Sequence, residues 1–469
     1  MKTLAEKYIT VMPGDCIGVL ATLPDNSFDS CVTDPPYHLT SIVKRFGGHN
    51  AAPAQFGKDG AYARASAGFM GKQWDGGDIA QSVELWTQVY RVLKPGAHLL
   101  AFGGTRTYHR MACAIEDAGF EIRDCIQWLY GSGFPKSHSV SVAIDKSSGI
   151  GPRGKAFNMK GDGGREEELA ANGREFLPPY EPHTDSARQW QGWGTALKPA
   201  CEPIVLARKP LSEKTVAANV LKWGTGAINV DGCRVAIDPN VDDMLRTVER
   251  GKRESETWET GSGFKNEKNH LTGVPANGRW PANVIHDGSD EVVGAFPETA
   301  TGFRPNQSTA EGRDGIVFGA GLHQQGVKPY DDQGSAARFF YTAKADGDDR
   351  LGSKHPTIKP LDLMQYLVRL ITPKGGTCLD PFAGTGTTGE AAFREGMHAL
   401  LIERETEYLA DIKRRIALCN SGPDERARGA MKEKLKGKPR DDGPLFSEWD
   451  AMWSKPFDKP EYIKGNGSL

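Results

Sequence analysis

The sequence lacks the features of a membrane protein, a disulfide-rich secreted protein or a zinc protein. No apolar run approaches the roughly 20 residues that a bilayer span requires. The opening residues, MKTLAEKYITVMPGD, contain no apolar stretch of a secretory signal. The 8 cysteines include no CxxC pair, which favours reduced thiols over a metal cluster. We therefore expect a cytoplasmic protein without a bound metal and without a membrane partner.

The composition is that of a globular protein with long loops. Hydrophobic residues at 38% and charged residues at 25% argue against wholesale disorder. The formal net charge of −2 does not exclude nucleic-acid binding, because a local basic patch matters more than the total. Glycine, with 56 of 469 residues, exceeds its usual share of about 7%. The excess predicts extended loop regions.

Short apolar strands alternate with helical segments in two separate parts of the chain. One part lies within residues 1–145 and the other within 351–420, and a strand, EPIVLARKP, stands between them at 202–210. Residues 146–195 and 213–350 are instead rich in glycine and polar residues. Alternating strands and helices predict an α/β sheet that is covered on both faces. The tail, 421–469, is basic at its start, and we expect it to be flexible.

A glycine-rich turn marks the second α/β part. The apolar strand GTCLD at 376–380 leads into GTGTTG at 384–389 and then into a helix. Glycines at such a turn bring bare backbone close to a ligand, and Glu403 at the end of the next strand could accept hydrogen bonds from ribose hydroxyls. No lysine follows the glycines, so the turn is not a phosphate-binding P-loop. Asp380 and Phe382 favour a zwitterionic nucleoside such as S-adenosylmethionine.

The tetrapeptide DPPY at 34–37 ends a strand in the first α/β part. Two prolines commonly end a strand, so the motif can have a purely structural role. It also suits chemistry at an exocyclic amine, whose lone pair is delocalised into the nucleobase ring. The Asp34 carboxylate and the Pro35 carbonyl, held rigid by Pro36, could accept both N–H bonds of that amine. The ring of Tyr37 could stack on an extruded base.

Together these motifs resemble the β class of amino-group DNA methyltransferases that use S-adenosylmethionine. DPPY precedes a variable middle, and DPFAGTGTT at 380–388 follows near the C-terminus. HPTIKP at 355–360 and GDC at 14–16 match further elements of that class. The runs GSGFPKS, GWGTALKPACEPIVLARKPL and GRWPANVI are similar to site-specific adenine methylases of phages, prophages and bacterial genomes.

The resemblance implies a Rossmann-like methyltransferase sheet with a circularly permuted motif order. The sheet would be mostly parallel with seven strands, one of them antiparallel and supplied by EPIVLARKP, and a loop-rich insertion would recognise the target. The implied division of the chain is a catalytic half (1–145), a loop-rich insertion (146–195), a core strand (196–212), a target-recognition region (213–350), a cofactor half (351–420) and a basic tail (421–469).

The resemblance also implies roles for particular residues. The catalytic residues would be Asp34, Pro35, Pro36 and Tyr37. The residues that bind S-adenosylmethionine, and its product S-adenosylhomocysteine, would be Asp15, Cys16, His355, Thr357, Lys359, Asp380, Phe382, Gly384, Thr385, Gly386, Thr387 and Glu403. Candidate DNA contacts are Lys44, Arg45, Lys136, Ser137, Arg279 and Trp280. The partner would be double-stranded DNA, and because the family often forms dimers a homodimer is an open expectation.

Three other interpretations remain beside N6-adenine methylation. Methylation of cytosine N4 follows the same mechanism, although Asp rather than Ser at the first position of the motif favours adenine. An NAD-dependent oxidoreductase could use the glycine turn and Glu403, but it would explain neither DPPY nor HPTIKP. A catalytically inert DNA-binding protein would not need both motifs intact. Cytosine C5 methylation is disfavoured, because the sequence contains no Pro-Cys dipeptide to supply the thiolate.

The separation of the two motifs generates a prediction for Asp34. Replacing Asp34 with Ala should abolish methyl transfer, because the amine loses its carboxylate acceptor, and should leave cofactor affinity within a few-fold. Calorimetric titration of the variant with S-adenosylmethionine measures that affinity. A loss of binding as severe as the loss of activity would place Asp34 in the cofactor site and contradict its assigned role.

Overall fold

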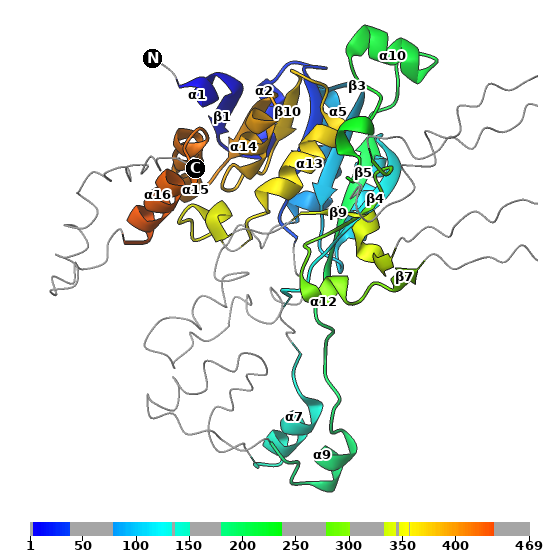
Figure 1. Ribbon diagram of the computed structural model, residues 1–469, viewed down its shortest axis with the longest axis vertical. Helices are drawn as coiled ribbons and strands as arrows, with labels where there is room; N and C mark the ends of the chain where they lie inside the picture. The colour runs from blue at the N-terminus through cyan, green and yellow to red at the C-terminus, as the bar shows by residue number, and fades with distance from the viewer. Residues whose placement is uncertain are drawn as a thin grey trace, which may run out of the picture.

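Nine strands form one sheet at the centre of the part of the chain that the structure, a computed structural model, describes (Figure 1). The described residues are 3–37, 78–133, 137–150, 180–236, 278–300, 333–343, 347–355 and 357–435. Across the sheet the strands run in the order β1 (Ile9–Pro13), β11 (His398–Glu403), β10 (Thr377–Asp380), β2 (Phe28–Thr33), β3 (Leu93–Phe102), β5 (Cys201–Arg208), β4 (Glu121–Leu129), β6 (Val284–His286) and β9 (Tyr341–Thr342).

The pairing confirms the α/β sheet with one antiparallel strand. β5 runs antiparallel to both of its neighbours, β3 and β4, and every other pairing in the sheet is parallel. The expected number of seven strands is wrong, because β6 and β9 extend the sheet beyond β4. These strands have only three and two residues, too few to show a period of alternating apolar residues.

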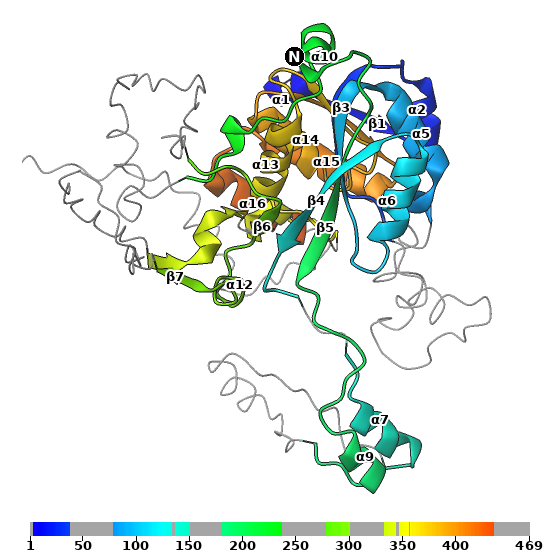
Figure 2. The same cartoon turned by 90° about the vertical axis from the view of Figure 1, so that its right-hand side faces the viewer.

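Alternating side chains of the central strands pack against a helical layer on each face of the sheet. Leu99 and Ala101 of β3 belong to a core with α2 (Cys16–Thr22), α5 (Val83–Val92) and α6 (Tyr108–Asp117). Leu100 and Phe102 belong to the opposite core, with α1 (Leu4–Tyr8), α13 (Leu361–Ile371), α14 (Thr387–Arg394) and α15 (Thr406–Leu418). Figure 2 shows α13 and α14 on one side of the sheet and α5 and α6 on the other.

Local sequence explains where these helices begin and which face they bury. In α5, the Ser82 hydroxyl caps the first turn by accepting a hydrogen bond from the Leu85 amide. Leu85, Trp86, Val89 and Val92 are all buried, as a helical period predicts. No helix in the described ranges combines the length and the apolar character that crossing a membrane requires.

A small helical unit projects from the catalytic edge of the sheet. It contains α7 (Val140–Ser147) and α9 (Asp185–Gln189), and both views show it apart from the sheet (Figures 1 and 2). The buried Asp145 carboxylate holds it together by accepting hydrogen bonds from the Tyr180 hydroxyl and from the Thr184 amide and hydroxyl. This unit lies at the ends of the predicted insertion 146–195, and its middle lies outside the described residues.

Parts of the predicted target-recognition region and of the predicted tail belong to the core. The region 213–350 contributes β6, β9, the helix α10 (Val216–Trp223), the helix α12 (Asp290–Val293) and the two-stranded sheet of β7 (Glu298–Ala300) and β8 (Gln333–Ser335). The expectation of a flexible tail is wrong for α16 (Pro423–Leu435), because Arg426 of this helix is buried against the core. Its polar sequence gives no apolar stripe, so the packing depends on that one charged residue. Residues 436–469 lie outside the described residues.

Candidate active site

Four adjacent strands end at the same edge of the sheet and bring the predicted motifs together. Asp15 follows β1, Glu403 ends β11, Asp380 ends β10 and Asp34 follows β2. All four strands are parallel, so their carboxyl ends lie side by side. Open α/β sheets bind their ligands at this edge. The fold thus joins the DPPY segment and the glycine turn, which are separated by more than three hundred residues in the sequence.

Asp380 links the two motifs directly. Its carboxylate accepts hydrogen bonds from the Thr33 hydroxyl at 2.7 Å, from the Thr388 hydroxyl at 2.6 Å and from the Phe382 amide at 3.1 Å. Burial raises the pKa of Asp380 to about 6, although these hydrogen bonds act in the opposite direction. Asp380 therefore fixes the start of the glycine turn against the strand that carries DPPY.

The glycine turn needs its glycines for two reasons. Gly384 and Gly386 have φ angles of +54° and +80°, which favour glycine because a side chain would be strained there. Gly389 packs against β11, where an added Cβ would lie 2.7 Å from the Leu401 side chain. An added Cβ at Gly384 would meet only the His355 ring, at 3.5 Å. The backbone at Gly384 therefore leaves room for a ligand between the turn and His355.

Glu403 lies directly beside that turn. One carboxylate oxygen accepts a hydrogen bond from the Gly384 amide at 2.8 Å, and the other accepts one from the Glu405 amide at 2.7 Å. Burial raises the pKa of Glu403 to about 7 against the lowering effect of these amides. Each carboxylate oxygen retains a further lone pair that can accept from a ligand hydroxyl.

Asp15 and Cys16 stand at the end of β1, next to Glu403. The Gly14 amide donates to the Glu403 carbonyl, which fixes this element against β11. One Asp15 oxygen caps α2 by accepting hydrogen bonds from the Ile17 and Gly18 amides. The Cys16 side chain packs into the core with α2, and burial raises the pKa of its thiol to about 11. At this position the side chain of Asp15, rather than that of Cys16, remains available to a ligand.

The remaining predicted cofactor residues occupy different environments. Thr385 and Thr387 are buried, and their hydroxyl oxygens lie 3.3 Å apart. Phe382 is half-buried against the core that contains α2. Thr357 is exposed, and its amide donates to the His355 ring. The structure thus places these residues around the turn, although the hydroxyls of both threonines face each other inside the protein.

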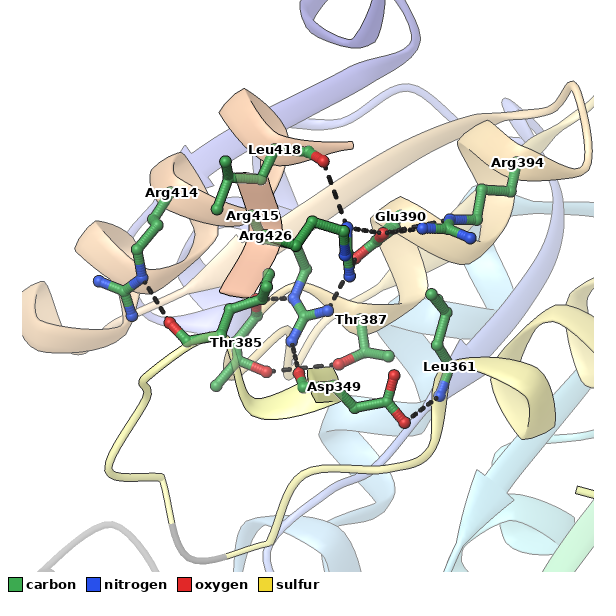
Figure 3. A network of polar contacts seen from close by, with 11 residues as sticks. Asp349, Leu361, Thr385, Thr387, Glu390, Arg394, Arg414, Arg415, Leu418 and Arg426 are labelled. Carbon is green, nitrogen blue, oxygen red and sulfur yellow. Dashed lines mark hydrogen bonds and ion pairs between the residues drawn. The ribbon is translucent and has the colours of Figure 1, made fainter. Parts of the chain in front are cut away.

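A fully buried glutamate supports the glycine turn from below (Figure 3). Glu390 of α14 forms ion pairs with Arg415 of α15 at 2.8 Å and with Arg426 of α16 at 2.7 Å. Arg415 also donates to the Thr385 carbonyl at 2.9 Å and to the Asp349 carbonyl at 2.5 Å. One guanidinium group therefore ties the turn to the helix behind it and to the segment that precedes HPTIKP.

DPPY forms a compact cluster with two charged residues from elsewhere in the chain. The Lys359 ammonium lies 2.9 Å from the Asp34 carboxylate, 2.9 Å from the Glu202 carboxylate and 3.0 Å from the Tyr37 hydroxyl. The Tyr37 hydroxyl lies 2.9 Å from Asp34 and 3.0 Å from Glu202. Burial alone would lower the pKa of Lys359, but the two carboxylates outweigh it and raise that pKa above its usual value.

This cluster differs from the sequence-based expectation in two respects. Lys359 was expected beside the cofactor, and the structure places its ammonium against Asp34 instead. Glu202 was not predicted as a site residue at all. The available signal was its position, since it is the only charged residue in the apolar run from 201 to 207. The Tyr37 hydroxyl, which stacking would not require, also has defined partners here.

A pocket adjoins the DPPY motif on the side of α6. Its lining includes Pro36, Tyr37, Gly103, Gly104, Thr107, Tyr108 and Met111. The Thr107 hydroxyl donates to the Tyr37 carbonyl at 2.7 Å, and an added Cβ at Gly104 would lie 3.2 Å from the Tyr37 ring. The backbone of the motif is therefore held from this side as well, next to space that a planar ligand could enter.

The candidate DNA contacts are only partly described. Ser137 closes the base of the projecting helical unit, because its hydroxyl accepts hydrogen bonds from the Thr195 and Ala196 amides. Arg279 pairs with Val235 through the backbone, and its guanidinium lies 4.8 Å from the Phe339 ring centroid. Trp280 is 66% exposed. Lys44, Arg45 and Lys136 lie outside the described residues.

Comparisons with known proteins identify a family. The family model N6_N4_Mtase, described as DNA methylase, matches residues 28–414. The type II methyltransferase M.HindIII of Haemophilus influenzae is 25% identical over 233 residues, which are 46% of this chain and 63% of that protein. The type II methyltransferase M2.DpnII of Streptococcus pneumoniae is 40% identical over 68 residues, which are 14% of this chain and 25% of that protein. The chain thus covers less than two thirds of the length of these relatives.

Solved structures give a weaker likeness. The DNA modification methylase TTHA0409 of Thermus thermophilus, in complex with S-adenosyl-L-methionine, is 16% identical with a TM-score of 0.36, covering 88% of this chain and 95% of that one. The cytosine-N4-specific PvuII DNA methyltransferase is 12% identical with a TM-score of 0.38, covering 91% of this chain and 93% of that one.

The buried Glu390 network generates a prediction for stability. Replacing Glu390 with Gln should lower the free energy of unfolding by about 3–5 kcal/mol, because two buried guanidinium groups lose their counter-charge. Arg394 provides a matched control, since it pairs with the same carboxylate at 2.8 Å from a side chain that is 36% exposed. Replacing Arg394 with Ala should cost about 1 kcal/mol or less. Urea unfolding followed by circular dichroism measures both values, and equal costs would contradict the importance of burial.

Proposed function

Because the chain belongs to the N6/N4 DNA methylase family, whose model matches residues 28–414, we propose that it transfers a methyl group from S-adenosylmethionine to the N6 amine of a flipped adenine in double-stranded DNA. One observation carries the proposal. The Thr33 hydroxyl binds the Asp380 carboxylate at 2.7 Å and thereby holds the end of the DPPY strand against the start of the glycine turn. A donor at the turn and an amine at Asp34 would be neighbours.

The residues at the glycine turn suit S-adenosylmethionine. The space at Gly384 admits a ligand close to the backbone, and the Glu403 carboxylate can accept hydrogen bonds from both ribose hydroxyls. Asp15, on the neighbouring strand end, retains one oxygen for the adenine amine. His355, which lies against Tyr408 with ring centroids 4.5 Å apart, closes the other side. When bound here, the cofactor supplies an electrophilic methyl group on a positively charged sulfur.

Asp34 and Pro35 would prepare the target amine. An exocyclic amine becomes nucleophilic when its N–H bonds are drawn out of the plane of the base, because its lone pair is then localised on nitrogen. The Asp34 carboxylate and the Pro35 carbonyl are the two acceptors for these N–H bonds. Lys359 and Tyr37 each donate to one oxygen of Asp34, which fixes the carboxylate and leaves a lone pair on each oxygen for the amine.

The target base has to leave the duplex to reach this carboxylate. The pocket lined by Pro36, Tyr37 and Gly104 adjoins the motif and provides a surface for a planar ring. We assign recognition of the DNA site to residues 213–350, the larger part of which lies outside the described residues. Adenine is favoured over cytosine because the motif begins with Asp34 rather than with serine, as the resemblance in motif implies.

The identity of the methylated base can be measured directly. Incubation of the protein with labelled S-adenosylmethionine and unmethylated DNA, followed by digestion to nucleosides and mass spectrometry, should yield N6-methyladenine as the labelled product. Labelled N4-methylcytosine would leave the active site as described and contradict the choice of base. Absence of labelled nucleosides across a DNA library that contains all short sites would contradict the proposed function itself.

The raised pKa of Glu403 predicts a pH dependence of cofactor binding. Ribose hydroxyls donate to the ionised carboxylate, and with a pKa of about 7 the ionised fraction rises as the pH rises through neutrality. Affinity for S-adenosylmethionine should therefore increase about tenfold from about pH 6 to about pH 8. Glu403→Gln should bind more weakly and show a flat profile. Glu405→Gln, the neighbouring control, should keep the wild-type profile, and a flat profile for the wild-type protein would contradict the assignment.

A further inference from the structure

Glu202 is placed at the reacting edge by the one antiparallel strand. It stands second in β5, opposite Trp128 of β4, with 19% of its side chain exposed. Its carboxylate lies 2.9 Å from the Lys359 ammonium and 3.0 Å from the Tyr37 hydroxyl, the two groups that also bind Asp34. Glu202 therefore reaches the DPPY motif only through groups that it shares with Asp34.

The cluster contains two carboxylates and one ammonium group. Asp34 with Lys359 alone would form a neutral pair, whereas Glu202 brings the formal charge of the cluster to −1. Lys359 cannot compensate both carboxylates, because it carries a single charge and is held at 2.9 Å from each. Tyr37 adds no charge, since burial first and then the two carboxylates raise the pKa of its hydroxyl well above the usual value.

The sign of this charge matters for the proposed reaction. Transfer forms a bond between the methyl carbon and the amine nitrogen and breaks the carbon–sulfur bond, whose electron pair stays on sulfur. The positive charge thereby passes to the nitrogen, which then releases one proton to Asp34 and on to solvent. A negative site next to the nitrogen stabilises this developing charge, whereas a neutral ion pair does so much less.

The surroundings of Glu202 strengthen its electrostatic effect. The Lys359 ammonium lies 4.9 Å from the centroid of the buried Phe102 ring. Trp128 and Tyr130 belong to or pack against the same core, and burial together with the Glu202 charge raises the pKa of Tyr130 to about 12. Aromatic side chains thus exclude water around the cluster, and charges interact more strongly where water is excluded.

We infer that Glu202 is a positioning residue for methyl transfer: it offsets the charge of Lys359 and holds Tyr37, so that the Asp34 carboxylate faces the target amine within a cluster of net negative charge. The inference rests on the proposed function, and it applies equally to an adenine and a cytosine amine. A purely structural clamp would require the shape and hydrogen bonds of Glu202 but not its charge.

Substitutions that keep shape and change charge separate these roles. Glu202→Gln should slow single-turnover methyl transfer by about 10- to 100-fold, at saturating cofactor and DNA, with both dissociation constants within about threefold of wild type. Glu202→Asp keeps the charge and should stay within about tenfold of the wild-type rate. Glu121→Gln is the matched control, because Glu121 pairs with Arg208 at the far end of the same strand, and its rate should be unchanged.

A double variant tests the charge balance. Glu202→Gln with Lys359→Met restores the formal charge of −1 and should transfer methyl groups faster than Glu202→Gln alone. A double variant no faster than the single one, a wild-type rate in Glu202→Gln, or equal losses in Glu202→Asp and Glu202→Gln would overturn the inference. Should Glu202→Gln react normally while Asp34→Ala is inactive, the inference fails and the proposed function stands. Should the wild-type protein methylate no DNA, the proposed function fails first.

Discussion

The parallel pairing of β10 with β2 is the constraint on which the site depends. Cys378 and Leu379 pair with Ser30 and Cys31, and the two strands then end together in Asp380 and Asp34. The hydrogen bond from Thr33 to Asp380 closes this junction at 2.7 Å. The pairing brings together residues from the two ends of a long chain, so neither half of the site can form alone. Long insertions between the halves are tolerated because the cost of closing a loop rises only slowly with its length.

Buried charges complete both halves of the site. Glu390 holds the glycine turn through Arg415, and Lys359 holds DPPY through Asp34 and Tyr37. Burying a charge is costly, and an apolar replacement is often no less stable. A charged cluster fixes direction more strictly than apolar packing, since each hydrogen bond has a required geometry. The two clusters therefore point to a demand for orientation at this edge, beyond what stability alone requires.

Sequence analysis reached the elements that short motifs encode. Asp34, Asp380 and Glu403 were each predicted at a strand end, and the antiparallel strand was predicted from an apolar run. Contacts between distant segments were not accessible in the same way. The partner of Lys359 depends on how the HPTIKP segment crosses the sheet edge, and the role of Glu202 depends on which strand lies beside β3. Strands of two or three residues and a polar helix anchored by Arg426 leave no periodic signal.

A crystal structure of the protein with S-adenosylhomocysteine tests the central claim most directly. The account predicts the ribose hydroxyls within hydrogen-bond distance of Glu403, the adenosine along the glycine turn, and the sulfur directed toward the open side of Asp34. Such a complex would place the departing methyl group and the target amine at one strand edge. A product molecule bound elsewhere, or bound with its sulfur directed away from Asp34, would contradict the account.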